Sequence, residues 1–183
     1  MIKRFQIILI FLFVAYGSFR LKMLSDDFEG SKMGSSGQSI RKAKQPSIIM
    51  YDCIEKYSTK YSIPKRFAYG IAYKETRYQG PFHWKYTHDR TSCAGAVGPM
   101  QIMLATAKSM WKGTAISETK LRTDIEFNVE TSMKLLRHLK DVYGDWKLVF
   151  GCYNTGKPIV NQYALDVYNF NPMYANKMWI PNE

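Results

Sequence analysis

Residues 63–78 read IPKRFAYGIAYKETRY, and they combine a helical pattern with an isolated carboxylate. Three large apolar residues and one acid recur at i, i+4, i+8 and i+11, namely Phe67, Ile71, Glu75 and Tyr78. This spacing predicts a helix with one stripe facing the core. Because Glu75 lies on that stripe, we expect its carboxyl group to be partly removed from water.

Glu75 is also conspicuous because residues 56–117 contain one other acidic residue, Asp89, among many Lys and Arg. Desolvation disfavours the charged form of a carboxyl group and raises its pKa, which suits a general acid that works near neutral pH. Periodicity alone leaves a second interpretation open. In that interpretation Glu75 lies near a helix end and turns outward, or pairs with Lys74 or Arg77.

The flanking sequence predicts a mostly α-helical domain that begins near Pro46. A polar residue followed by proline at 62–64 is typical of a helix start, and Asp124 and Gly144 are typical of a helix N-cap and a helix end. Helices are expected over residues 48–61, 62–78, 99–111, 124–144, 145–153 and 160–170. Residues 79–97 contain glycine and proline without periodicity, so we expect a long loop or a short β-hairpin there.

The chain has 183 residues, of which 46% are hydrophobic and 22% are charged. This is room for one domain with a packed core, and it excludes a wholly disordered, collagen-like or disulfide-dense small scaffold. The formal net charge is +11. Such an excess favours an anionic partner, and nucleic acid, anionic lipid and a negatively charged cell-wall polymer all satisfy it.

The N-terminus has the pattern of a secretory signal. Lys3 and Arg4 are followed by an apolar run from Phe5 to Tyr16, which ends in small residues around Gly17. The run is shorter than the roughly 20 residues that cross a bilayer, so we expect cleavage after Gly17, with an uncleaved membrane anchor as the alternative. Export to the periplasm or cell envelope makes nucleic acid a poor candidate partner.

The exported part is predicted to consist of a flexible Gly- and Ser-rich spacer at 18–45 and a folded domain at 46–183. It contains three cysteines, Cys53, Cys93 and Cys152. At most one internal disulfide can form, and the sequence does not say which pair is joined.

Five segments follow one another along the domain in a characteristic order. They are the helix ending in Glu75-Thr76-Arg77-Tyr78, then Ala94-Gly95-Ala96-Val97-Gly98-Pro99-Met100-Gln101-Ile102, Phe127-Asn128-Val129-Glu130, Cys152-Tyr153-Asn154-Thr155-Gly156, and Tyr163 with Val167. Together they resemble the soluble lytic transglycosylase family, the lysozyme-like enzymes that cleave peptidoglycan. Order and spacing agree over about residues 46–170. Thr76, Pro99 and Cys152 depart from the usual Ser, Leu and Ala, but they remove no group that the chemistry needs.

The resemblance implies a mostly α, lysozyme-like fold of the α+β lysozyme superfamily, in one catalytic domain with the 79–97 loop beside the cleft. It implies that Glu75 is the catalytic residue. It also implies a substrate-binding set, which comprises Thr76, Tyr78, Gly98, Met100, Gln101, Asn128, Tyr153, Asn154 and Tyr163. For Asn128, a helix cap is the alternative.

Several of these residues have a physical reason to bind a sugar. Gly95 and Gly98 let the backbone approach a ligand where a side chain would obstruct it. Gln101 offers both a donor and an acceptor, and Tyr153 and Asn154 at a helix end can point into the same cleft. The alternatives are an ordinary turn for the two glycines and a helix C-cap with a half-buried tyrosine for the pair.

The family's mechanism needs one protein carboxylate, because the 2-acetamido group of the substrate replaces the second. The resemblance implies that Glu75 protonates the oxygen between N-acetylmuramic acid and N-acetylglucosamine and then deprotonates the 6-hydroxyl, which closes a 1,6-anhydro ring. No metal or organic cofactor is implied. The implied partner is the peptidoglycan glycan strand, bound by a monomer. A membrane tether applies only if the signal stays uncleaved, and an envelope-spanning machine or a phage particle is left open as a setting.

Three other functions remain open. A hydrolytic lysozyme of the same fold would use Asp89 or a distant carboxylate to position water. A cysteine peptidase would use one of the thiols with His138 as base. A catalytically inactive wall-binding component would keep the fold alone. The spacing of His83, His88 and Cys93 matches no usual zinc pattern, so we expect a solvated loop there.

Overall fold

The computed structural model describes residues 43–172, and this part of the chain is mostly helical, as predicted. The helices in it are α1 (Pro46–Lys60), α2 (Lys65–Thr76), α3 (Leu104–Met110), α4 (Glu118–Thr123), α5 (Ile125–Tyr143), α6 (Trp146–Thr155) and α7 (Gln162–Tyr168). The predicted signal at 1–17 and the spacer up to residue 42 lie outside the described residues. Between residues 43 and 172, no helix combines the length and apolarity that a bilayer crossing requires.

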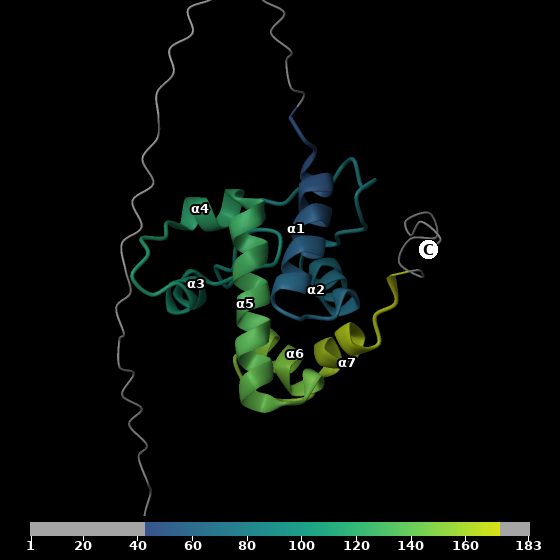
Figure 1. The fold of residues 1–183 in the computed structure, drawn as a ribbon, viewed down its shortest axis with the longest axis vertical. Helices are drawn as coiled ribbons and strands as arrows, with labels where there is room; N and C mark the ends of the chain where they lie inside the picture. Colours follow the sequence, from purple (N-terminus) through teal and green to yellow (C-terminus); the bar gives the residue numbers. More distant parts are fainter. Residues whose placement is uncertain (1–42, 173–183) are drawn as a thin grey trace, which may run out of the picture. The chain divides into compact units, whose positions relative to one another are not determined.

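The long helix α5 is the centre of the helical domain (Figure 1). Helices α1, α3, α4 and α6 all pack against it, and α2 packs against α1 on one side and α7 on the other. Helices α6 and α7 also pack together. The contact between α2 and α7 therefore joins segments that are far apart in the sequence.

The boundaries of the later helices follow from their capping residues. Asp124 accepts a hydrogen bond from the Phe127 backbone N–H at 3.0 Å and caps α5, which ends at Gly144 with φ 72°. Asp145 caps α6 and Asn161 caps α7 in the same way. Each such cap contributes about 1 kcal/mol to the helix it begins.

An aromatic cluster ties α2 to the C-terminal helices. The Phe67 ring is 2% exposed and lies 4.9 Å from the ring centroid of Phe150, 5.1 Å from that of Trp146 and 5.8 Å from that of Tyr168. Burial of one such ring stabilises the fold by about 2 to 3 kcal/mol. The cluster fixes the orientation of α2 relative to α6 and α7.

The prediction of one helix over 99–111 is wrong in its first part, because α3 begins only at Leu104. Val97 and Ile102 exchange two backbone hydrogen bonds of 3.0 Å, which folds the residues between them into a turn. Gln101 has φ 50°, a left-handed conformation that interrupts any helix. The sequence analysis also misses the short helix α4.

Residues 79–97 form a loop and not a β-hairpin. The pairing observed there is an isolated antiparallel bridge between Thr91 and Val97. Near its start, the loop is attached to α1 by a hydrogen bond of 2.9 Å from Ser47 Oγ to the carbonyl of Pro81.

Residues 97–102, which we call the central turn, are held by one side chain of α5. Asn128 is fully buried, and its amide nitrogen donates to the carbonyls of Val97 and Leu121, both at 2.9 Å. Its amide oxygen accepts from the backbone N–H of Met100 at 2.9 Å. Asn128 is thus not an N-cap. It bonds a carbonyl in the last turn of α4, and it anchors this turn and the central turn to α5.

Substitution of two glycines by alanine tests this anchoring. Both have a left-handed backbone, with φ 80° at Gly98 and 83° at Gly95. A Cβ at Gly98 would lie 2.4 Å from Asn128 Nδ2 and 2.8 Å from the Leu121 carbonyl, whereas a Cβ at Gly95 would have no neighbour within 4 Å. We expect Gly95→Ala to cost about 1 kcal/mol of backbone strain, and Gly98→Ala about 3 kcal/mol or more because overpacking adds to it.

Denaturant unfolding of the two variants measures the difference directly. Gly95→Ala is the matched control, because its backbone strain is the same and its surroundings are open. Equal losses of unfolding free energy in the two variants would show that Asn128 does not hold the central turn in place.

Candidate functional site

Glu75 lies in the last turn of α2, on the stripe that the sequence predicts. Phe67 and Ile71 of this stripe are buried, and Glu75 is half-buried at its end. Arg77 ends the helix in a left-handed conformation with φ 58°, and its N–H bonds the carbonyl of Tyr73 at 2.9 Å. The chain therefore turns away immediately after Glu75, which leaves the carboxylate at a helix end.

Two side chains modulate the acidity of this carboxylate. The hydroxyl of Tyr163 on α7 donates to Glu75 Oε1. Burial raises the pKa of Glu75 above its usual range, while the Tyr163 hydrogen bond and the positive charge of Lys74 oppose the increase. Lys74 is itself paired with Asp166 on α7, with Nζ and Oδ2 2.6 Å apart. Glu75 is thus a carboxyl group with a raised pKa and a fixed hydrogen-bond partner.

Tyr153 on α6 is the third side chain near this carboxylate. Its hydroxyl donates to the carbonyl of Met100 at 2.7 Å, and because that proton is used, Ser132 Oγ donates to the tyrosine oxygen at 3.0 Å. Burial and the negative charge of Glu75 both raise the pKa of Tyr153. Helices α2, α6 and α7 therefore bring Glu75, Tyr153 and Tyr163 together beside the central turn.

Thr76 and Tyr78 flank Glu75 but are buried. The hydroxyl of Thr76 lies 2.9 Å from the carbonyl of Pro99 and 2.9 Å from the hydroxyl of Tyr86. The hydroxyl of Tyr78 donates to the carbonyl of Ser47 at 2.8 Å. Both hydroxyls are bonded within the protein, so in this structure they fix the end of α2 against the central turn and α1.

Gly98, Met100 and Asn128 are also buried. The first two belong to the central turn, and Asn128 is the side chain that holds it. The expectation that Gly98 leaves room for a sugar needs correction, because the space beside it is filled by Asn128. The Met100 backbone is held between Asn128 and Tyr153. The backbone of the central turn contacts the residues around Glu75, since the Met100 carbonyl accepts from Tyr153.

Gln101 and Asn154 are the more accessible members of the predicted set. Gln101 is half-buried, and its amide nitrogen donates to the carbonyls of Gly98 at 2.8 Å and Arg90 at 3.1 Å. Asn154 is exposed at the end of α6, and its amide oxygen accepts from Asn161 Nδ2 at 3.1 Å.

Two residues that support this site are missed by the sequence analysis. Tyr86 bonds Thr76, and its buried ring packs edge-on against Tyr78 with centroids 5.0 Å apart. Ser132 bonds Tyr153 from α5. Loop aromatics and small helical residues are common, so neither carries a signal that periodicity or motif spacing detects.

All three cysteines lie in the described part of the chain, and the buried one is poorly suited to act as a nucleophile. All three cysteines are free, and burial is the main cause that raises the pKa of Cys53 to about 12, which is the opposite of what a thiolate nucleophile requires. Between residues 43 and 172, no three His, Cys, Asp or Glu residues are placed to hold a metal ion together.

The sequence and the structure were also compared with known proteins. The family described as "Transglycosylase SLT domain" matches residues 52–174. Solved structures that resemble the chain include the 70 kDa soluble lytic transglycosylase of Escherichia coli, with 23% identity, a TM-score of 0.48 and coverage of 64% of this chain and 18% of that chain. The same enzyme in complex with bulgecin A has 24% identity, a TM-score of 0.48 and the same coverages.

An inactive mutant of the lytic transglycosylase Slt from Pseudomonas aeruginosa also matches, with 19% identity, a TM-score of 0.47 and coverage of 68% of this chain and 22% of that chain. This chain thus spans about a fifth of the length of these enzymes. A search of curated proteins gave no match. Because the family match extends over residues 52–174, well over half of the sequence, the chain belongs to the transglycosylase SLT domain family.

Proposed function

We propose that this protein is a peptidoglycan lytic transglycosylase, which cleaves the β-1,4 bond between N-acetylmuramic acid and N-acetylglucosamine and leaves 1,6-anhydro ends. The observation that carries the proposal is Glu75, a half-buried carboxyl group with a raised pKa that Tyr163 holds in place, in a chain of the SLT domain family. A raised pKa keeps the proton on the acid at the pH where it must be donated.

The reaction needs one protein carboxyl group in two roles. Protonated Glu75 donates its proton to the glycosidic oxygen as the bond from C1 of the muramic acid breaks, and the 2-acetamido carbonyl oxygen bonds to C1. The 6-hydroxyl oxygen of the same sugar then attacks C1, which releases the acetamido oxygen, and its proton returns to the Glu75 carboxylate. The enzyme ends in its starting protonation state, and no water is consumed.

The neighbours of Glu75 have different proposed roles. Tyr163 orients the carboxylate through its hydrogen bond and lowers the pKa that burial raises. Gln101 and Asn154, which are partly or fully accessible, are proposed to bind sugar hydroxyl and acetamido groups. Thr76, Tyr78, Gly98, Met100 and Asn128 are proposed to act as positioning residues.

A hydrolytic lysozyme of the same fold is the alternative, and it needs a group that positions water. In this alternative Asp89 or a distant carboxylate positions the water, and Asp89 lies exposed on the 79–97 loop. The carboxylate next to the site is Asp166, which is bound to Lys74 and Gln162. We favour the mechanism with one carboxyl group, because Asp166 is engaged by Lys74 and Gln162 and Asp89 lies exposed on the loop.

The cellular setting is proposed from the same chemistry. The substrate is the glycan strand of peptidoglycan, and the exported protein would act in the periplasm or cell envelope as a monomer. Cleavage after Gly17 would remove Lys3 and Arg4 and leave a net charge of 24 − 15 = +9, which suits an anionic wall polymer. A membrane tether would require that the apolar N-terminal segment is retained.

Glu75→Gln should abolish cleavage of isolated peptidoglycan, with a loss of at least about 1,000-fold, because the amide can neither donate nor accept the proton. Mass spectrometry of the products from the unmodified protein should show 1,6-anhydro-muramic acid ends. Reducing muramic acid ends would identify a hydrolase instead, and cleavage by the variant at the original rate would exclude Glu75 as the acid.

The fold of this variant can be checked separately. Because the pKa of folded Glu75 is raised, its ionisation lowers stability as the pH rises above the unfolded-state value, so at pH 7 Glu75→Gln should be as stable as the original chain or more stable. The matched control is Glu126→Gln, an exposed carboxylate of α5, which should leave cleavage unchanged.

Tyr163→Phe tests how the acid is tuned. Loss of the donated hydrogen bond removes a cause that lowers the pKa of Glu75, so the pKa should rise further. Activity falls as the pH rises through the pKa of the general acid. The descending limb of the profile of kcat/KM against pH should therefore move to higher pH.

The control for this experiment is Tyr61→Phe, which removes a hydroxyl bonded to the carboxylate of Glu130 between α1 and α5. It should leave the pH profile in place. A profile that stays fixed in Tyr163→Phe, or moves to lower pH, would contradict the assigned role of Tyr163.

A further inference from the structure

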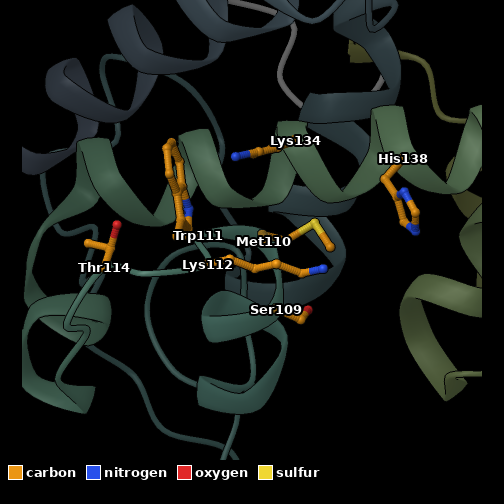
Figure 2. Close-up of a pocket in the computed structure, with 7 residues that line it drawn as sticks. All are labelled: Ser109, Met110, Trp111, Lys112, Thr114, Lys134 and His138. Atoms are coloured by element: carbon orange, nitrogen blue, oxygen red, sulfur yellow. The ribbon is translucent and has the colours of Figure 1, made fainter. Parts of the chain in front are cut away.

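A hollow of about 510 Å³ lies between the end of α3, the turn that follows it and one face of α5 (Figure 2). Its lining is dominated by cationic and aromatic side chains and includes Met110, Trp111, Lys112, Thr114, Lys134 and His138. None of these residues belongs to α2, α6 or α7, which carry Glu75, Tyr153 and Tyr163. The hollow is therefore a different place from the candidate active site.

The hollow and the candidate active site use different faces of the same helix. Thr131, Lys134 and His138 follow at i, i+3 and i+7 along α5 and form the stripe that faces α3. Ser132, one residue further along the helix from Thr131, bonds Tyr153 instead. The helix thus links a cationic surface to the side chain that lies beside Glu75.

The wall of the hollow is held in place by specific contacts. The indole N–H of Trp111 donates to Thr131 Oγ1 at 2.9 Å, and its ring packs against Phe127 with centroids 5.7 Å apart. The ammonium group of Lys134 lies 3.9 Å from the centre of the Trp111 ring. An aromatic face attracts a cation without neutralising it, so Lys134 is positioned there with its full charge.

The positive charge of the hollow is not balanced by carboxylates. No acidic residue lines it. Lys112 and Lys134 take part in none of the ion pairs formed among residues 43–172. The acidic neighbour of His138 on α5 is Asp141, which is bound to Arg137.

We propose that this hollow binds an anionic group, a carboxylate or a phosphate, on the cell-wall polymer. Lys112 and Lys134 both line this hollow and no carboxylate does, so an anion bound there is attracted by both positive charges. The proposal rests on the proposed function for the identity of the polymer. The bound group gives the enzyme a second contact with the wall, away from the bond that Glu75 cleaves.

The test measures binding of the full chain to isolated wall in the Glu75→Gln background, so that the polymer is not cleaved. The wall is taken from a bacterium whose wall carries both peptide-stem carboxylates and phosphate polymers. We expect the double variant Lys112→Gln/Lys134→Gln to weaken binding at least about five-fold at low salt. Lys112→Gln alone should give a smaller loss. Both losses should shrink at high salt, because salt screens the charges. Lys112 is exposed, so its single variant tests the site even if replacement of Lys134 disturbs Trp111.

The matched control is Lys85→Gln/Lys108→Gln, which removes the same charge from two exposed positions outside the hollow. Two treated walls identify the source of the anion. The excess loss is the loss of binding in Lys112→Gln/Lys134→Gln beyond that in the control variant. If the bound group is a phosphate, this excess loss disappears on wall stripped of phosphate polymers. If the bound group is a carboxylate, the excess loss disappears on wall whose carboxylates are converted to neutral amides. Equal binding of the two double variants on untreated wall, or an excess loss that persists on both treated walls, would overturn the proposal.

The binding comparison is independent of the proposed chemistry. If the Glu75→Gln variant still cleaves wall, the catalytic assignment fails while the difference between the two lysine pairs stays measurable with soluble wall fragments. If that variant is inactive and the two pairs bind alike, the proposed function stands and the anion site is excluded.

Discussion

The buried amide of Asn128 holds together the parts of the chain that surround Glu75. It bonds three backbone groups, at Val97, Met100 and Leu121, and each donor or acceptor left unsatisfied by the loss of one of them would cost about 1 to 3 kcal/mol. The central turn that it fixes presents the Met100 carbonyl to Tyr153. The neighbouring Pro99 carbonyl bonds Thr76, the residue after Glu75. One side chain of α5 therefore sets the positions of backbone groups that contact both α2 and α6.

The pKa of Glu75 is set by causes that act in opposite directions. Burial at the end of an apolar stripe raises its pKa, whereas the Tyr163 hydroxyl and the charge of Lys74 lower it. Lys74 is also paired with Asp166. Both Tyr163 and Asp166 belong to α7. The packing of α7 on α2 thus influences the pKa of the Glu75 carboxyl group as well as its position.

The long amphipathic helix α5, with Asp124 and Gly144 at its ends, was predictable because its signals are local. The position of Glu75 was predictable for the same reason. The central turn was not, because the left-handed Gln101 depends on pairing between Val97 and Ile102 and on Asn128 from a distant helix. The sequence around Asn128 agrees with a helix cap, with a substrate-binding residue or with a residue that holds the central turn. Tertiary contacts, which one sequence does not show, decide among these roles.

The distribution of charge over α5 explains how a basic chain keeps a concentrated positive surface. On the face toward α1, Glu126 and Glu130 accept from Lys56 and Lys60. Exposed pairs of this kind contribute little stability, at most about 1 kcal/mol each, but they cancel charge locally. The face toward α3 has no such carboxylates at the hollow, so the charge of Lys134 is retained beside Trp111. The charge of the described residues is therefore not spread evenly, and two uncompensated lysines line a concave surface that shares α5 with the support of the candidate active site.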